Sequence, residues 1–150
     1  MTHVSPFLWF NNQAAEARAF YANAFGIESR TDDLPVGDDT FLGALSLPGM
    51  DLMLFNGGPH HEFNHAISLF VLVKTQEEVD RLWDGLTAGG GEPGRCGWLT
   101  DKFGVSWQIV PEALGRLMSD SNRERAERVR DAMLNMDKLI IADLEAAYNR

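Results

Sequence analysis

Two polar side chains, Ser106 and Gln108, alternate with apolar residues in the segment CGWLTDKFGVSWQIVP, residues 96–111. The apolar residues of this pattern are Val105, Trp107 and Ile109. Successive side chains of a β-strand point to opposite faces, so Ser106 and Gln108 are expected to share one face. A hydroxyl and an amide on one face can hydrogen-bond to solvent or to a bound organic molecule. The spacing alone leaves both interpretations open.

Three histidines form an HHxxxH pattern in the segment NGGPHHEFNH, residues 56–65. Neutral imidazole is a common zinc ligand, so His60, His61 and His65 are one candidate metal set, with Glu62 close by. A loop cluster without fixed supporting hydrogen bonds makes a weak natural site, however. The sequence therefore predicts no metal site and keeps the three histidines as the alternative.

Cys96 and Asp101 are the other candidates for chemistry. A cysteine acts as a nucleophile beside a base that lowers its pKa, and no histidine flanks Cys96 in the sequence. We expect a packed or half-exposed thiol. Asp101 is expected to shape the turn before Gly104, with a role as general base as the alternative. Catalytic residues are therefore not assigned.

Composition excludes several classes of protein. The chain has 150 residues, 45% of them hydrophobic, and a formal net charge of −9. A negative charge of this size argues against nucleic acid and anionic membrane surfaces as partners. One cysteine excludes an internal disulfide and a multi-cysteine metal cluster. The longest apolar run, about residues 67–73, is far shorter than the ~20 residues that span a bilayer, and the N-terminus lacks a signal-peptide pattern. We expect a cytoplasmic protein.

The elements that position these residues fall into two similar halves. In the first half, Val4–Phe10 predicts a strand, and residues 13–25 have the apolar spacing of an amphipathic helix. Asn11 or Asn12 is the expected N-cap, and Gly26 the expected C-terminal cap. Three short β signals follow, at Ile27–Thr31, Thr40–Leu47 and Asp51–Phe55.

The second half repeats this order. Ala66–Val73 predicts a strand, and Thr75 with Glu78 forms a capping box that opens a helix over 76–88. Two β segments follow, at Arg95–Leu99 and Val105–Val110. Matching order at an offset of about 62 or 63 residues predicts a duplicated module. We expect one domain, with modules at 1–58 and 64–112 and a helical segment at 113–150.

The C-terminal segment 123–148 reads as one long amphipathic helix, with apolar residues every three or four positions. We expect this helix to pack on its own domain. The alternatives are that it covers a cavity or pairs with a second subunit.

Four stretches resemble the PhnB-like family, often labelled 3-demethylubiquinone-9 3-methyltransferase-like, within the vicinal oxygen chelate superfamily of glyoxalases, bleomycin-resistance proteins and extradiol dioxygenases. These stretches are FLWFNNQAAEARAFYANAFG at 7–26, ISLFVLVKTQEEVDRLWDGLTAGG at 67–90, CGWLTDKFGVSWQIVP at 96–111 and RVRDAMLNMDKLIIADLEAAY at 128–148. The resemblance implies an α+β fold of two βαβββ modules. Their curled sheets would form a cavity, and the protein would commonly be a homodimer.

The resemblance also implies where metal-using relatives place their ligands. The four positions fall near Pro6, Leu52, Ser68 and Gln108, and none of these side chains is an imidazole or carboxylate. A slip of one residue brings in only Asp51 as a possible ligand. The family metal site is therefore expected to be missing, and His65 is expected at the mouth of the cavity.

The same resemblance turns Ser106 and Gln108 into candidate pocket residues. The full predicted lining is mostly apolar with a few hydrogen-bonding groups, which suits a small organic ligand. It comprises Leu8, Phe10, Leu52, Leu54, Ser68, Phe70, Ser106 and Gln108. Three tryptophans are instead expected in the core between sheet and helices: Trp9, Trp83 and Trp107.

The function that follows is binding of an apolar or aromatic compound without a metal and without a cofactor. The alternatives are a metal-dependent lyase, isomerase or dioxygenase-like enzyme using the three histidines, and a subunit whose role is association. Rossmann-type methyltransferases bind their cofactor at a glycine-rich turn between a strand and a helix. Here Gly57-Gly58 precede a proline and Gly89–Gly91 follow the predicted helix, so the sequence does not support methyl transfer.

Overall fold

A computed structural model describes residues 1–29, 34–35 and 41–150 of the chain. It divides into two compact units, Met1–Phe63 and Asn64–Arg150. Within the described ranges, each unit contains one four-stranded sheet. The elements of the first unit are β1 (Phe7–Phe10), α1 (Ala14–Phe25), β2 (Leu34–Pro35), β3 (Phe41–Leu47) and β4 (Met50–Asn56).

Helix α1 is held at both ends by local chemistry. Gly26 closes it in the left-handed conformation, with φ +65°, as predicted. The N-terminal prediction was wrong, because Gln13 takes the N-cap position without a side-chain cap bond. Asn56, at the end of β4, instead accepts a 2.8 Å hydrogen bond from the Ala14 N–H. A residue distant in sequence, Asn56, thus satisfies a backbone N–H at the start of α1, which Asn11 or Asn12 was expected to do.

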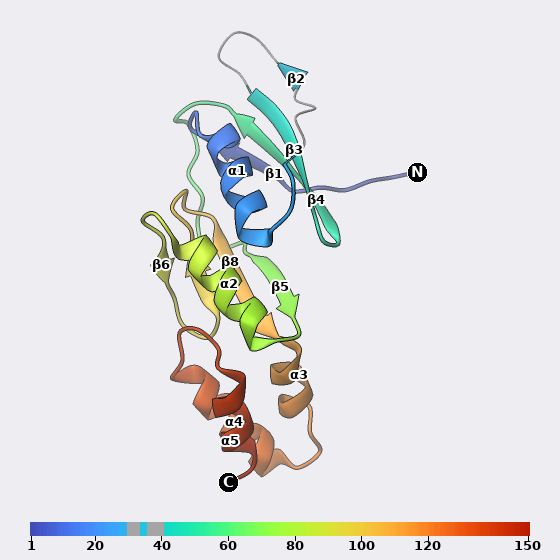
Figure 1. The fold of residues 1–150 in the computed structure, drawn as a ribbon, viewed down its shortest axis with the longest axis vertical. Helices are drawn as coiled ribbons and strands as arrows, with labels where there is room; N and C mark the ends of the chain where they lie inside the picture. The colour runs from blue at the N-terminus through green and yellow to red at the C-terminus, as the bar shows by residue number, and fades with distance from the viewer. Residues whose placement is uncertain (30–33, 36–40) are drawn as a thin grey trace. The chain divides into compact units, whose positions relative to one another are not determined.

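The first sheet has the strand order β1-β4-β3-β2, with β1 parallel to β4 and the remaining pairs antiparallel. Its covered face carries fully buried leucines, among them Leu45, Leu52 and Leu54. Helix α1 contacts β3 and β4 (Figure 1) and buries an alanine-rich stripe together with Tyr21. Small alanine side chains let the helix approach the sheet closely, so this layer is the core of the first unit.

The second unit repeats the arrangement and then continues into helices. Its elements are β5 (Leu69–Val73), α2 (Gln76–Thr87), β6 (Glu92–Pro93), β7 (Trp98–Thr100), β8 (Ser106–Pro111), α3 (Glu112–Met118), α4 (Arg123–Leu134) and α5 (Ile141–Tyr148). The predicted capping box is confirmed: the Thr75 side chain accepts the Glu78 N–H, and the Glu78 carboxylate accepts the Thr75 N–H. The N–H groups of Lys74 and Thr75, which both donate to the Glu78 carboxylate, lower its pKa.

The two sheets have the same topology. The second has the order β5-β8-β7-β6, with β5 parallel to β8, so each strand and helix of the first unit has a counterpart. Helix α2 lies against its sheet (Figure 1), and it buries Val79, Leu82 and Trp83. The α+β fold made of a duplicated βαβββ module is therefore confirmed.

Strand boundaries differ from prediction in a few places. Residues 27–29 are not a strand, and residues 30–31 of that predicted strand, like Thr40, lie outside the described residues. The two-residue strand β6 was not predicted, because Glu92-Pro93 carries no apolar alternation. None of the helices in the described part of the chain is long and apolar enough to cross a membrane.

The prediction of a single C-terminal helix was wrong, because a non-helical segment separates α4 from α5 (Figure 1). We call residues 135–140 the linker. Its carbonyl groups serve other partners: Met136 O accepts the Cys96 N–H, and Asp137 O accepts the Gly97 N–H, each at 2.8 Å. A continuous helix would use these carbonyls for its own i to i+4 bonds, so docking of the linker replaces helical bonds there.

Gln76 at the start of α2 forms hydrogen bonds with the backbone at the end of the linker. Its amide nitrogen donates to Leu139 O at 3.1 Å and to Asp80 at 2.9 Å, and its oxygen accepts the Ile141 N–H at 2.8 Å. Lys138 adds an ion pair with Asp80 at 2.9 Å. The bonds from Gln76 and Lys138 lower the pKa of the Asp80 carboxyl. The linker is thus tied to α2 by side chains that sequence periodicity does not reveal.

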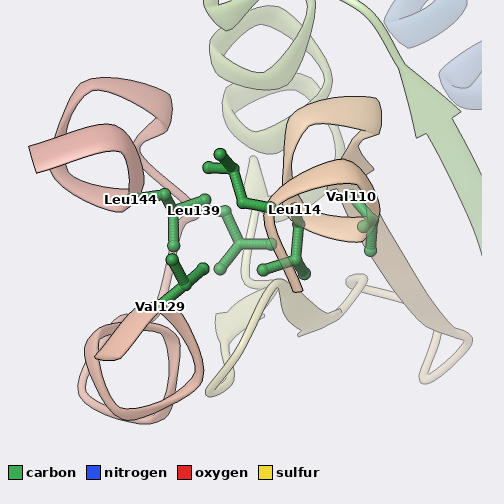
Figure 2. Packing of buried hydrophobic residues seen from close by; sticks show 6 residues of the cluster. Val110, Leu114, Val129, Leu139 and Leu144 are labelled. Carbon is green, nitrogen blue, oxygen red and sulfur yellow. The ribbon is translucent and has the colours of Figure 1, made fainter. Parts of the chain in front are cut away.

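The C-terminal helices share an apolar cluster with the end of β8. Figure 2 shows Leu139, Leu144 and Val129 pointing toward one another, and all three are fully buried. At the chain end, the Tyr148 hydroxyl donates to Asp120 at 2.6 Å and is the leading cause of a lowered pKa at that carboxyl. The expectation that this segment packs on its own domain is met within the second unit.

Candidate ligand-binding groove

The second sheet has one face packed on α2 and one open face. Trp107 and Ile109 are fully buried, and α2 contacts β8. The alternate residues of the strands share the open face, where Gln108 lies opposite Phe70 on one side and Trp98 on the other. Phe70 is 59% exposed, so this face carries an aromatic side chain with little protein over it.

A groove of about 670 Å³ lies between this open face and the first C-terminal helices. Its sheet side is mostly apolar, and it is made by Phe70, Leu72, Cys96, Trp98, Gln108 and Val110. Its helix side comes from α3 and α4, and it is made by Glu112, Leu114, Gly115, Met118 and Met133. A cavity of this size with apolar walls and few polar groups is typical of a site for a small organic molecule.

Two side-chain pairs supply polarity on the open face. The Gln108 amide nitrogen donates to Ser68 Oγ at 2.9 Å, which fixes the amide's orientation and makes its oxygen the group that can accept a bond from a ligand. His65 Nδ1 lies 2.8 Å from Ser106 Oγ. Ser106 is only 1% exposed, so its hydroxyl holds the imidazole in place rather than presenting a nucleophile.

Asp101 organises the turn that leads into β8. Its Oδ1 accepts the N–H groups of Phe103 and Val105 at 2.9 and 3.0 Å, and its Oδ2 accepts the indole N–H of Trp107 at 2.9 Å. The carboxylate is 3% exposed, and both of its oxygens are engaged. The structural interpretation of Asp101 is confirmed, because the carboxylate holds the turn that leads into β8, the strand from which Gln108 lines the groove.

Cys96 places the only thiol of the chain at the groove. It is half-buried and has φ +59°, a conformation that few residues other than glycine adopt. The hydrogen bond from its N–H to Met136 in the linker holds it there. The half-exposed thiol that the sequence predicts is therefore confirmed, and its position makes it a natural reporter of groove occupancy.

The predicted lining in the first unit needs correction. Leu8, Phe10, Leu52 and Leu54 are all buried, with Leu52 and Leu54 at 0% exposure. Their strand positions and the contact of α1 with this sheet put them in the core beneath α1. The open face carries their sequence neighbours instead, so the register assumed for this module was out by one residue.

That opposite face of the first sheet is aromatic. Phe55 lies between Phe7 and Trp9, with ring centroids 5.3 and 5.1 Å away, and His61 contacts Trp9 edge-on at 4.8 Å. The Trp9 indole N–H donates to Gly58 O at 2.9 Å. The prediction of a core position is confirmed for Trp83 and Trp107, but Trp9 is half-buried on the open face.

The three candidate histidines have different surroundings. His61 packs on Trp9, His65 is bonded to Ser106, and the imidazole of His60 lies near Gly58. Within the described residues there is no group of three or more His, Cys, Asp or Glu side chains placed to hold a metal ion. Asp51, the alternative raised by a one-residue slip, is paired with His3 at 3.4 Å, and both side chains are well exposed.

Sequence reasoning missed most of the groove. Leu72 and Val110 could have been found by extending the alternation of Phe70 and Gln108 two residues further along each strand. Trp98 and the helix-side residues could not, because their positions depend on the register of β7 and on the broken C-terminal helix.

The sequence and the fold both have known relatives. Residues 2–110 match the profile of the family described as 3-demethylubiquinone-9 3-methyltransferase. No curated protein matches the chain. A putative 3-demethylubiquinone-9 3-methyltransferase, PhnB protein, from Bacillus cereus is 29% identical, with a TM-score of 0.59 over 73% of this chain and 99% of its own.

Two further solved structures show the same fold at lower identity. A protein from Pseudomonas aeruginosa is 23% identical, with a TM-score of 0.62 over 75% of this chain and 98% of its own. A genomically encoded fosfomycin resistance protein from Listeria monocytogenes is 15% identical, with a TM-score of 0.50 over 74% and 93%. With the profile match covering well over half of its residues, the chain belongs to the PhnB-like, 3-demethylubiquinone-9 3-methyltransferase family, and it shares its fold with these three solved proteins.

Proposed function

We propose that the protein binds a small organic molecule with an apolar or aromatic body in the groove of its second unit, and so sequesters or senses that compound. The observation that carries the proposal is the groove itself, about 670 Å³ between a half-open sheet and two helices. Ligand sites commonly occupy about 300–1,000 Å³ and combine apolar walls with a few fixed polar groups.

The chemistry of the walls supports an aromatic or aliphatic ligand. Phe70 and Leu72 are 59% and 58% exposed, and Trp98, on the far side of β8, is half-buried. Covering such apolar surface stabilises a complex by about 25 cal/mol per Å² removed from water. The Gln108 amide, oriented by Ser68, then gives the ligand one directional hydrogen bond.

Binding without a metal is part of the proposal. It rests on the residue types at two of the positions that the family resemblance assigns to ligands, Ser68 and Gln108. These neutral side chains bond to each other, and neither is a ligand that divalent transition metals favour. Elemental mass spectrometry of protein purified without a polyhistidine tag tests this. Near-stoichiometric zinc, nickel, iron or manganese would favour the metal-dependent alternative.

Methyl transfer is not proposed, despite the family description. The glycine-rich fingerprint of nucleotide cofactors lies between a parallel strand and the N-terminus of a helix. In this structure Gly89 and Gly90 come after α2, while Gly57 and Gly58 come after β4 and before a proline. The site that the fold does offer is a groove for an organic molecule.

Alkylation of Cys96 gives a direct test, because this is the only thiol and it lies at the groove. We expect 4-phenyl-1-butanol to slow the reaction of Cys96 with N-ethylmaleimide in a saturable way. Undiminished alkylation at every probe concentration would contradict the proposal.

Two phenylalanines form a matched pair of variants for this assay. Phe70 on β5 and Phe7 on β1 lie at the open faces of equivalent strands, and they are 59% and 52% exposed. Phe70→Ala is expected to weaken the protection of Cys96 at least several-fold, because it removes an aromatic wall. Phe7→Ala is expected to leave protection unchanged, and the reverse result would place the ligand on the first unit.

Self-association remains a prediction. The exposed apolar residues of the second unit include Ile67, Phe70 and Leu72, which a second subunit could also cover. Sedimentation velocity decides whether the predicted homodimer forms, and a probe that shifts this equilibrium would show that ligand and subunit compete for the same face.

A further inference from the structure

We propose that the groove of the second unit selects apolar ligands that carry a cationic amine and discriminates against carboxylic acids. This inference rests on the proposed binding function and adds the chemical class of the ligand. It follows from one juxtaposition, an acidic side chain in the lining of an aromatic and aliphatic groove.

Among the described residues that line the groove, Glu112 is the one with a charged side chain, and none is Lys, Arg or His. The other polar linings are the Gln108 amide and the Cys96 thiol. The amide nitrogen of Gln108 donates to Ser68, so its oxygen is turned to the role of acceptor. A carboxylate and an amide oxygen both favour a ligand group that donates hydrogen bonds and carries positive charge.

The spacing of these groups defines the ligand further. Gln108 and Val110 lie on the open face of β8, and Glu112 follows as the first residue of α3. At about 3.3 Å of rise per strand residue, Glu112 lies roughly 10–13 Å from Gln108 along the groove. The apolar surface of Phe70, Leu72 and Val110 borders this distance. An aryl or alkyl body with an amine at one end fits that order of groups.

Aromatic walls add to the preference for a cation. Trp98 and Phe70 both line the groove, and a cation over an aromatic face is attracted by the ring's quadrupole. Glu112 is exposed, so its attraction for an amine is modest and weakened by salt. Exposed ion pairs and cation–π contacts each raise an affinity by about two- to fivefold. Together they predict an amine bound about five- to twentyfold more tightly than the matching acid.

The selectivity comes from Glu112, at the start of α3 on the helix side of the groove. The family profile matches residues 2–110, and Glu112 lies beyond that range, where α3 begins. The groove therefore combines a sheet of the family fold with a segment outside the matched region.

The test uses three probes with one aryl-alkyl body: 4-phenylbutylamine, 4-phenyl-1-butanol and 4-phenylbutyrate. Isothermal titration calorimetry at constant ionic strength should give affinities in the order amine, alcohol, acid. In Glu112→Gln, amine affinity should fall about two- to fivefold, because only the ion pair is lost, acid affinity should rise, and alcohol affinity should stay the same.

Glu77→Gln is the matched control, because Glu77 is also exposed in the first turn of a helix, but on α2, which covers the opposite face of the sheet. Both variants change the net charge by one unit, so an equal response would show a global charge effect and overturn the inference. The inference also fails if the acid binds as tightly as the amine. Binding of the alcohol without discrimination by charge overturns the selectivity alone, whereas no binding of any probe overturns the proposed function as well.

Discussion

Asp101→Asn is the sharpest test of how the groove strand is held. The carboxylate is 3% exposed and accepts three hydrogen bonds, from two backbone N–H groups and the indole of Trp107. Asparagine has one oxygen, so one side of the group becomes an NH₂ that meets a donor. Whichever way the amide turns, at least one acceptor is lost and a donor is left facing a donor.

The size of the effect follows from these bonds. A hydrogen bond to a charged group contributes about 1.5–3 kcal/mol, and a buried donor left without a partner costs a further 1–3 kcal/mol. We expect Asp101→Asn to lower the free energy of unfolding by about 2.5–6 kcal/mol. That is a large share of the roughly 5–15 kcal/mol that stabilises a typical domain.

Urea unfolding followed by tryptophan fluorescence measures this loss, with an unchanged slope showing that the unfolded state is the same. Asp84→Asn, an exposed change on α2, should stay within about 0.5 kcal/mol of wild type. In a Trp107→Phe background the cost of Asp101→Asn should shrink, because one of the donors is gone. A cost below about 0.5 kcal/mol in the wild-type background would refute the assignment of Asp101 as the anchor of β8.

Three further predictions test packing and hydrogen bonds within each of the two units. Gly57→Ala should destabilise the first unit by about 1–3 kcal/mol in thermal unfolding, because a Cβ there would overlap the Trp9 ring. Gln76→Ala should cost about 1–3 kcal/mol and speed amide exchange at the start of α5, since it removes the bonds that dock the linker. Tyr148→Phe should raise the pKa of Asp120 toward its usual value, measured by carboxyl-carbon NMR. The folded pKa of Asp120 is lowered, so this carboxylate stabilises the fold above its unfolded pKa, which is near 3.8. That stabilisation is lost as pH falls through the folded pKa. In Tyr148→Phe, the free energy of unfolding should therefore depend less on pH in this acid range.

How much of the site could be predicted depended on how clearly polar and apolar residues alternate within each strand. In β8, Ser106 and Gln108 alternate with Trp107 and Ile109, so the open face could be identified from the sequence. In β1 the sequence FLWF is apolar at every position, and period-two alternation cannot tell which face meets the helix. On β4, Asp51 shares its face with Met53 and Phe55, so this polar residue marks the open face of the strand.

The C-terminal segment shows a different limit. Its apolar residues step by three or four through the linker, so periodicity favours one helix. The break at residues 135–140 comes from partners distant in sequence, chiefly Gln76 and the backbone of Cys96. The order of the elements and the duplicated module rest on local patterns, and they were predictable for that reason.

The central claim is that the groove of the second unit is the ligand site, and the indole N–H signals of the four tryptophans test it directly. A ¹H–¹⁵N spectrum would be recorded during titration with 4-phenyl-1-butanol, with each indole assigned by a Trp→Phe variant. We expect the Trp98 signal to move in a saturable way, because Trp98 lines the groove. Trp83 and Trp107 should stay nearly still, since they are buried on the opposite face of the sheet. A Trp98 signal that does not move while Trp9 shifts would contradict the account and assign ligand binding to the aromatic face of the first unit.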